Sequence, residues 1–260
     1  MKTLIESTHA RATLDAHGVA TLTIQGAKSL NILGSPVIAD LTQALALLAQ
    51  NSEIRVLILR GSGDKAFVAG ANIVEMSTLT RATAEHFIKG LRDLCEGVRR
   101  TPVPVIARLP GWALGGGLEL ATACDIRIAS RSAQFGMPEV KVGIPSVIHA
   151  ALLPRLIGQG RADWLLLTGE LIDAETALAW GLVNQVVDHQ ALDDTIESLA
   201  RSLCALGPAA LRQQKTLLRR WETLPLAAAI DDSVTEFGKA FETGEPQRFM
   251  GEFARAKAAR

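Results

Sequence analysis

The chain has 260 residues, of which 48% are hydrophobic, so it is long enough to bury a large core within one α/β domain. Twenty-seven basic and 27 acidic residues give a formal net charge of zero, whereas nucleic-acid-binding proteins normally carry a basic excess. No apolar run reaches the roughly 18 residues of a membrane span, and the N-terminus lacks a hydrophobic stretch of signal-peptide length. The three cysteines have no metal or redox spacing and indicate free thiols, so we expect a cytoplasmic protein that binds neither nucleic acid nor membrane.

The first quarter of the chain has the pattern of a hairpin that leads into a parallel sheet. Apolar residues alternate over 10–14 and 19–24 around a turn that contains Gly18, which predicts a β-hairpin. Residues 36–50 have apolar side chains at helical spacing, and the apolar run 54–59 predicts another strand. Strand, helix and strand in this order are typical of a crossover unit in a mostly parallel sheet.

The centre of the chain combines a glycine turn with a carboxylate. A predicted helix over 83–98 and a predicted strand over 103–109 precede the segment 111–120, which contains three consecutive glycines and then Glu119. A turn between a strand and a helix leaves backbone N–H groups without partners, and the helix dipole favours negative charge beside them. Such donors next to a proton-carrying group suit chemistry at the carbon beside a thioester or other carbonyl. The alternative is a tight turn followed by a glutamate that only complements the dipole.

The second half predicts further short elements and then helices alone. The segment 133–139 is a strand end and a turn that carries a second carboxylate, Glu139, and Ser146 is a plausible N-cap for a helix over 147–157. Beyond residue 190 only helical patterns remain, over 192–206, 208–221, 225–242 and 246–258. Helices with apolar faces beyond a finished sheet must pack on something, and a neighbouring subunit is a candidate.

Four segments, taken together and in order, resemble the crotonase superfamily, the enoyl-coenzyme A (CoA) hydratase/isomerase family. They are residues 66–73, 111–120, 133–139 and 167–183. The resemblance implies an α/β fold with a crotonase-like ββα spiral core over residues 1–190. It also implies a C-terminal helical trimerisation region over residues 191–260, in a homotrimer or a dimer of trimers.

The resemblance further implies a reaction and its residues. The backbone N–H groups of Ala71 and Gly116 would hold a thioester carbonyl oxygen, and Glu119 and Glu139 would hold one water. We therefore expect an enoyl-CoA hydratase, which adds water across the double bond of a 2-trans-enoyl-CoA to give a 3-hydroxyacyl-CoA. The presence of both glutamates favours hydration, because the simple double-bond isomerases of the family usually depend on only one of them. The alternatives are an isomerase, hydrolase or decarboxylase on acyl-CoA, and a non-catalytic subunit.

Coenzyme A is part of the expected substrate, and the resemblance implies no separate cofactor. It places this moiety along two segments, with Lys28 and Leu30 on one and Ala69, Asn72 and Ile73 on the other. We also expect the adenine near basic residues of the C-terminal helices, such as Arg255 or Lys257. The five histidines lack the spacing of metal ligands, so no metal site is expected.

The sequence departs from the family pattern at two places. Asn72 stands where the family commonly has aspartate, so a carboxylate interaction is lost while the backbone role survives. The loop 142–150 is one residue shorter than usual and carries Val147 and Ile148 where the family has glycines, so we expect a reshaped acyl pocket. Ser146 is still expected to offer its N–H to the catalytic water. His149, a single histidine in an apolar segment, is more typical of a packed core residue than of a site residue.

Overall fold

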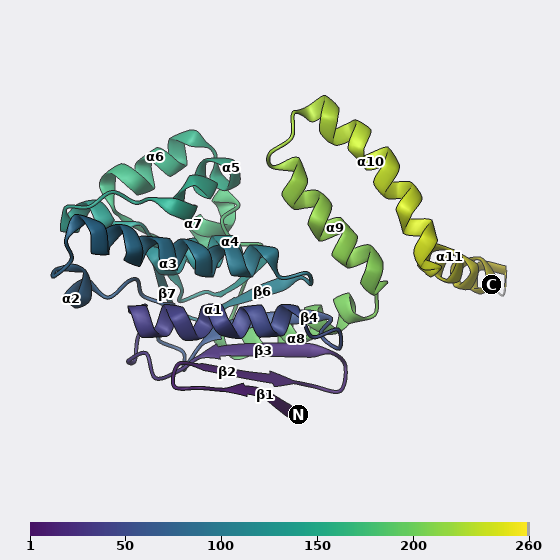
Figure 1. Ribbon diagram of the computed structural model, residues 1–260, viewed down its shortest axis with the longest axis horizontal. Coiled ribbons are helices and arrows are strands. Elements are labelled where there is room, and N and C mark those ends of the chain that lie inside the picture. Colours follow the sequence, from purple (N-terminus) through teal and green to yellow (C-terminus); the bar gives the residue numbers. More distant parts are fainter. Residues whose placement is uncertain (259–260) are drawn as a thin grey trace.

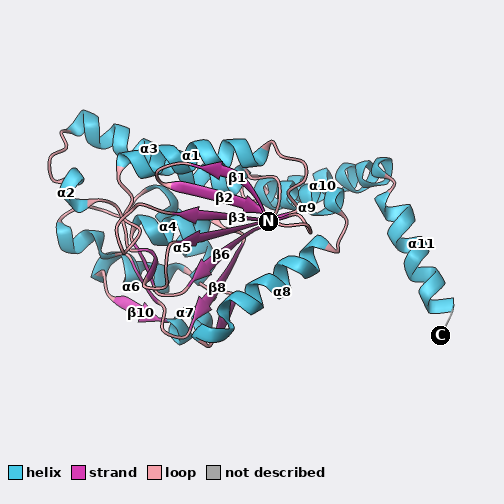
Figure 2. Ribbon diagram, turned by 90° about the horizontal axis from the view of Figure 1, so that it is seen from below, coloured by secondary structure: helices cyan, strands magenta, loops and turns pink. Residues whose placement is uncertain are grey.

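The computed structural model describes residues 1–258 and contains two β-sheets with helices on both sides (Figures 1 and 2). The larger sheet has seven strands in the order β1-β2-β3-β4-β6-β8-β11. Its first three strands pair antiparallel, and all pairs from β3 onward are parallel. The strands are β1 (Lys2–Glu6), β2 (Ala10–Leu14), β3 (Val19–Ile24), β4 (Val56–Gly61), β6 (Val105–Leu109), β8 (Ile126–Ser130) and β11 (Gln185–Val187).

The smaller sheet has four strands in the order β10-β9-β7-β5. Strands β5, β7 and β9 are parallel to one another, and β10 pairs antiparallel with β9. Along the chain, three large-sheet strands are each followed by a small-sheet strand and then by helices, so a ββα unit repeats. The strands are β5 (Ala66–Val68), β7 (Trp112–Leu114), β9 (Gln134–Gly136) and β10 (Leu171–Asp173).

The large sheet is buried on both faces, and its side chains alternate between two cores as the period of a strand requires. On β4, Leu57 and Leu59 face the main core, while Val56 packs in the second core with Ile196. Helices α1 (Ser35–Ala49) and α3 (Arg81–Arg100) lie together on the first face, and α8 (Leu192–Cys204) covers the other (Figure 2). The described helices between them include α2 (Ile73–Met76), α4 (Gly116–Ala123), α5 (Leu153–Ile157), α6 (Gln159–Thr168) and α7 (Ala174–Trp180).

The last helices project from this body (Figure 1). They are α9 (Pro208–Trp221), α10 (Leu226–Ala240) and α11 (Glu245–Ala258). Of these three helices, as described over residues 1–258, only α9 contacts the main body through a buried ion pair. The Lys215 Nζ lies 2.6 Å from the Asp125 carboxylate and 2.9 Å from the carbonyl oxygen of Val103. No helix in this range is both long and apolar enough to cross a bilayer.

The expected α/β class, hairpin and parallel sheet are confirmed, but one expected helix is wrong. Residues 147–157 do not form a continuous helix; they form the 3-10 helix η2 (Ile148–Leu152) followed by α5. Ser146 is not an N-cap, because Val147 precedes η2 and makes no side-chain cap. The reason is local: the Ser146 hydroxyl is already engaged with Glu139, and Ile148 has a positive φ of 40° that breaks the helical path.

Candidate active site

The candidate site lies where three parallel strands of the small sheet end. Because β5, β7 and β9 are parallel neighbours, their carboxyl ends meet at one edge of the sheet. The turns that leave these ends carry Ala71, Gly116 and Glu139, respectively. Gly117 brings the first two turns together, since a Cβ built at this position would lie 2.1 Å from the carbonyl oxygen of Val68. A glycine is therefore required where α4 begins against β5.

Two backbone N–H groups at this edge have no hydrogen-bond partner within residues 1–258. Ala71 forms a parallel bridge to Leu33, in which the bonds run from the Leu33 N–H to Gly70 and from the Asn72 N–H to Leu33. The N–H of Ala71 itself therefore points away from the bridge. Gly116 is the first residue of α4, so its N–H precedes the intrahelical bonds and lies at the positive end of the helix dipole. Both can donate to a ligand oxygen.

Glu119 is buried beside this turn, with only 3% of its surface exposed. Its Oε1 accepts a hydrogen bond of 2.9 Å from the N–H of Ala150, the middle residue of η2. Its Oε2 lies on the side of Gly116, 3.9 Å from where a Cβ of that residue would sit. Burial raises the pKa of Glu119 to about 8; the Ala150 N–H opposes the shift, and the charge of Glu139 adds to it.

Glu139 approaches the same turn from the other side. Its Oε1 would lie 2.4 Å from a Cβ at Gly115, a residue whose φ of 52° also requires glycine. Its Oε2 accepts a 3.0 Å hydrogen bond from the hydroxyl of Ser146. Burial raises the pKa of Glu139, while its own backbone N–H and the Ser146 hydroxyl lower it. With a pKa near 8, the Glu119 carboxyl is mostly neutral at pH 7 and can carry a proton beside Glu139.

The two carboxyls and the two N–H groups border one cavity of about 470 Å³. Its remaining wall is mainly apolar and comes from α2, the turn between α2 and α3, α3 itself and the loop before η2. The apolar residues are Met76, Leu79, Phe87, Ile88, Leu91, Ile144 and Val147. Five predicted site residues thus meet at one place: Ala71, Gly116, Glu119, Glu139 and Ser146. The arrangement can hold an oxygen that becomes negative while protons move a short distance away.

The other predicted binding residues lie beside this cavity rather than in its wall. The N–H of Ala69 donates to the carbonyl of Leu30 at 3.0 Å, which places the two predicted segments side by side. The exposed Lys28 lies at the start of one segment and has a φ of 59°, and Ile73 at the end of the other is 59% exposed. The Asn72 side chain caps α2 by accepting a hydrogen bond from the N–H of Glu75. The asparagine that replaces the family's aspartate therefore serves as a helix N-cap.

His149 does not reach the cavity. It is buried, and its Nε2 lies 3.0 Å from Glu96 on α3, which agrees with the packed interpretation. The sequence did not indicate that the N–H of Ala150 would contact Glu119, because the shortened loop leaves open which residue lies there. The cavity residues of α3 were not predicted either, because they have ordinary core spacing. Within residues 1–258 no three histidine, cysteine or acidic side chains cluster as metal ligands would.

Comparison with known proteins gives consistent matches over nearly the whole chain. Residues 15–258 match the sequence model of the family described as enoyl-CoA hydratase/isomerase. A short-chain-enoyl-CoA hydratase of Clostridium acetobutylicum is 36% identical over 86% of this chain and 86% of its own. A crotonyl-CoA hydratase of Syntrophomonas wolfei is 35% identical over 88% and 89%. A crystal structure of an enoyl-CoA hydratase from Bacillus anthracis superposes with a TM-score of 0.89 at 30% identity, over 98% and 97% of the two chains.

Proposed function

The chain belongs to the enoyl-CoA hydratase/isomerase family, and we propose that it is an enoyl-CoA hydratase, a hydro-lyase that adds water to a 2-trans-enoyl-CoA. One observation carries the proposal: two N–H groups that have no partner within residues 1–258 and two carboxyls border the same apolar cavity. Double-bond isomerisation needs one proton carrier, whereas hydration must move protons of a water as well, so a pair is the better match. The two hydratases named above support the same reaction.

In the proposed reaction the N–H groups of Ala71 and Gly116 donate to the thioester carbonyl oxygen. The oxygen of a water held between Glu119 and Glu139 adds to the β-carbon, and the electron pair of the double bond moves to give an enolate on that carbonyl oxygen. A proton of the water passes to the charged carboxyl, and the α-carbon receives a proton from the neutral one. The pair ends with one proton and one charge as before, and the product is a 3-hydroxyacyl-CoA.

Loss of absorbance of the conjugated enoyl thioester tests the proposal. We expect turnover of crotonyl-CoA or of longer or branched 2-trans-enoyl-CoA substrates by the purified protein. No turnover on any of these would contradict hydration. Turnover of a 3-enoyl-CoA to its 2-enoyl isomer without hydration would favour the isomerase alternative.

Hydration activity is expected to follow a bell-shaped pH profile. Acid protonates both carboxyls, and alkali removes the single proton that the pair needs, so activity falls at both ends. Because the pKa of Glu119 is raised to about 8, we expect the alkaline decline near pH 8. Burial also raises the pKa of Glu139, so the acid decline is expected above the usual glutamate range. The logarithm of kcat/KM against pH measures both limbs, and a flat profile to about pH 9.5 would contradict this assignment.

Ser146 is expected to position Glu139 through its hydroxyl. Its hydrogen bond to Oε2 favours the charged form, so Ser146→Ala is expected to raise the pKa of Glu139 and shift the acid limb to higher pH. A hydrogen bond to a charged group is worth roughly 1.5–3 kcal/mol, which corresponds to a shift of the acid limb by about 1–2 pH units. Ser146→Thr keeps the hydroxyl and should restore the acid limb to its wild-type position. An unshifted acid limb in Ser146→Ala would show that the hydroxyl only packs there.

The acyl-CoA substrate is expected along the two neighbouring segments described above. We propose that Lys28 and Leu30 on one, and Ala69, Asn72 and Ile73 on the other, contact its coenzyme A part, which brings no further cofactor. The contact between Ala69 and Leu30 supports this, because it forms a continuous strip beside the cavity. Arg255 and Lys257 lie exposed on α11, away from the described cavity, so an adenine contact with them would need another subunit.

We propose a homotrimer or a dimer of trimers, formed mainly through the projecting helices. One side of α10 exposes large apolar side chains at helical spacing, at Leu226, Ile230, Val234 and Phe237. Such a surface is unusual on a monomer and typical of an interface. Light scattering would give the mass, and a monomer would contradict the proposal. A cytoplasmic location belongs to the same proposal, supported by the buried free thiols of Cys95 and Cys124.

A further inference from the structure

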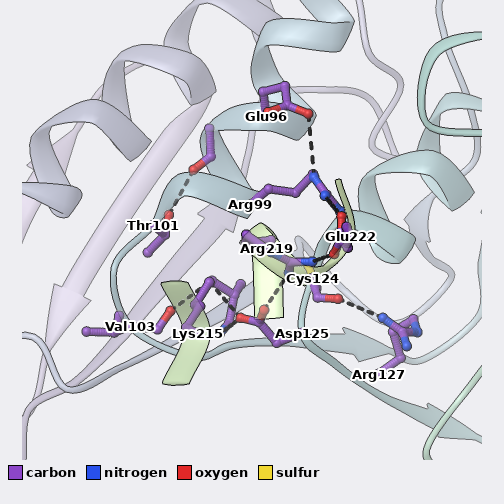
Figure 3. A network of polar contacts seen from close by, with 12 residues as sticks. Glu96, Arg99, Thr101, Val103, Cys124, Asp125, Arg127, Lys215, Arg219 and Glu222 are labelled. Atoms are coloured by element: carbon purple, nitrogen blue, oxygen red, sulfur yellow. Dashed lines mark hydrogen bonds and ion pairs between the residues drawn. The ribbon is translucent and has the colours of Figure 1, made fainter. Parts of the chain in front are cut away.

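A second cavity, of about 600 Å³, lies apart from the acyl cavity and shares none of its lining residues. It is bordered by the carboxyl ends of α3 and α4, by β8 and α5, and by the last turns of α9. Part of its wall is apolar, through Leu152, Leu156, Leu218 and Trp221. Most of the polar wall belongs to the network between α3, β8 and α9 that Figure 3 shows, and Arg155 of α5 adds to it.

The charged groups of this wall are unbalanced. Four arginines and two acidic residues border the cavity: Arg99, Arg127, Arg155, Arg219, Asp125 and Glu222. Glu222 pairs with Arg99 and Arg219, and Asp125 pairs with Arg219 and with Lys215 (Figure 3). Two further residues contact these six without bordering the cavity: Lys215 pairs with Asp125, and Glu96 pairs with Arg99. They contribute one charge of each sign. Two positive charges therefore remain without compensation around the cavity.

Of the four arginines that border the cavity, Arg127 and Arg155 form no ion pair with an acidic side chain within residues 1–258. Arg127 is only 5% exposed; its Nε donates to the carbonyl of Leu182 and its Nη1 to that of Cys124, each at 2.7 Å. Its Nη2 makes no hydrogen bond within residues 1–258. Arg155 donates from Nη1 to the backbone carbonyl of Glu222 at 2.9 Å and forms no ion pair in that same range. Burying a guanidinium without a counter-ion is costly, and burial accordingly lowers the pKa of Arg127.

A purely structural role explains only part of this arrangement. Two bonds to backbone carbonyls account for how Arg127 joins β8 to the segments at Cys124 and Leu182. They do not account for the position of Arg127 in the cavity wall with an Nη2 that has no partner within residues 1–258, nor for Arg155 on α5, which has no ion pair in that range. Guanidinium groups with free donors in a partly enclosed space are typical of sites for phosphate or carboxylate groups.

We propose that this cavity binds a small oxyanion with two negative charges, of the phosphate or dicarboxylate class, between Arg127 and Arg155. The ligand neutralises the excess charge and links β8 and α5, and through Glu222 and Arg219 it also holds the end of α9. The site is separate from the proposed reaction centre, so its occupancy is measured as binding and stability rather than as catalysis.

Titration calorimetry and thermal unfolding with inorganic phosphate test this proposal, with chloride adjusted to keep the ionic strength constant. We expect saturable phosphate binding and a rise in Tm of the full-length protein. Arg155→Gln removes one of the two positive charges. Because this side chain is exposed, the fold should tolerate the change, and phosphate binding is expected to weaken at least about tenfold. Arg92→Gln is the matched control: it removes an arginine of α3 that pairs only with its neighbour Asp93 at the surface, and it should bind as the wild type does.

Parallel titrations with malonate separate the two ligand classes. Binding of phosphate alone assigns the site to phosphate groups, and equal binding of both assigns it to dianions in general. Arg127→Gln should abolish binding; if that variant does not fold, Arg155→Gln still decides. The proposal is overturned if neither anion binds saturably, or if Arg155→Gln binds phosphate as tightly as the wild type and the Arg92→Gln control do.

Discussion

Replacing Glu119 by glutamine is expected to lower kcat for enoyl-CoA hydration by about 10²–10⁴-fold, the usual contribution of a positioned acid–base group. The amide oxygen of glutamine can still accept the N–H of Ala150, so the local fold should survive while the titrating proton is lost. Glu139→Gln is expected to cause a loss of the same order, because hydration needs both members of the pair. Steady-state kinetics on crotonyl-CoA, with circular dichroism to check folding, measures both losses.

Glu85→Gln is the matched control for these two variants. Glu85 lines the mouth of the same cavity, but its side chain is 68% exposed and pairs with Arg81, so its removal should leave kcat within about twofold. A large loss in only one of the two glutamine variants would point to one-base isomerisation. Near wild-type hydration in both would contradict the proposed mechanism.

The turns that border the cavity of the proposed reaction could be predicted because their sequence demands a special backbone. Gly115 needs a positive φ and Gly117 faces a carbonyl oxygen, so a glycine run between a strand and a helix marks the turn whatever surrounds it. The same run leaves the N–H of Gly116 at the start of α4, and Glu119 in the first turn of that helix marks a candidate acid–base group beside it. Local sequence and local geometry agree here, which is why the resemblance and the structure give the same residues.

Other features depend on contacts between distant segments and leave no local signal. Strands β7 and β10 have three residues each, too few for an alternating pattern, and they exist because β9 lies between them. Phe87 and Leu91 line the acyl cavity, yet they have the spacing of any buried helix face. The partner of Glu119 is a backbone N–H, which no side-chain pattern can reveal. The shortened loop determines that Ala150 supplies it.

Gly116→Pro is expected to remove one donor from the carbonyl oxygen while leaving the helix in place. Gly116 is the first residue of α4, a position where proline is well tolerated because its N–H has no intrahelical partner. Gly115, with φ 52° and ψ −127°, is a glycine and can precede proline in this extended mirror-image conformation. Loss of one such donor typically lowers kcat by about 10²–10³-fold, so we expect a loss of this order in hydration.

Gly116→Ala separates the lost donor from the added bulk. The alanine keeps its N–H, and its Cβ would clash with the end of the Leu91 side chain, at 2.8 Å, which can rotate away; the Glu119 Oε2, at 3.9 Å, would be at ordinary contact distance. We therefore expect Gly116→Ala to keep most of the activity that Gly116→Pro loses, with both variants showing wild-type circular dichroism. An active Gly116→Pro would mean that the thioester oxygen does not depend on this amide. Equal losses in the two variants would mean that crowding against Leu91, rather than the missing hydrogen bond, is responsible.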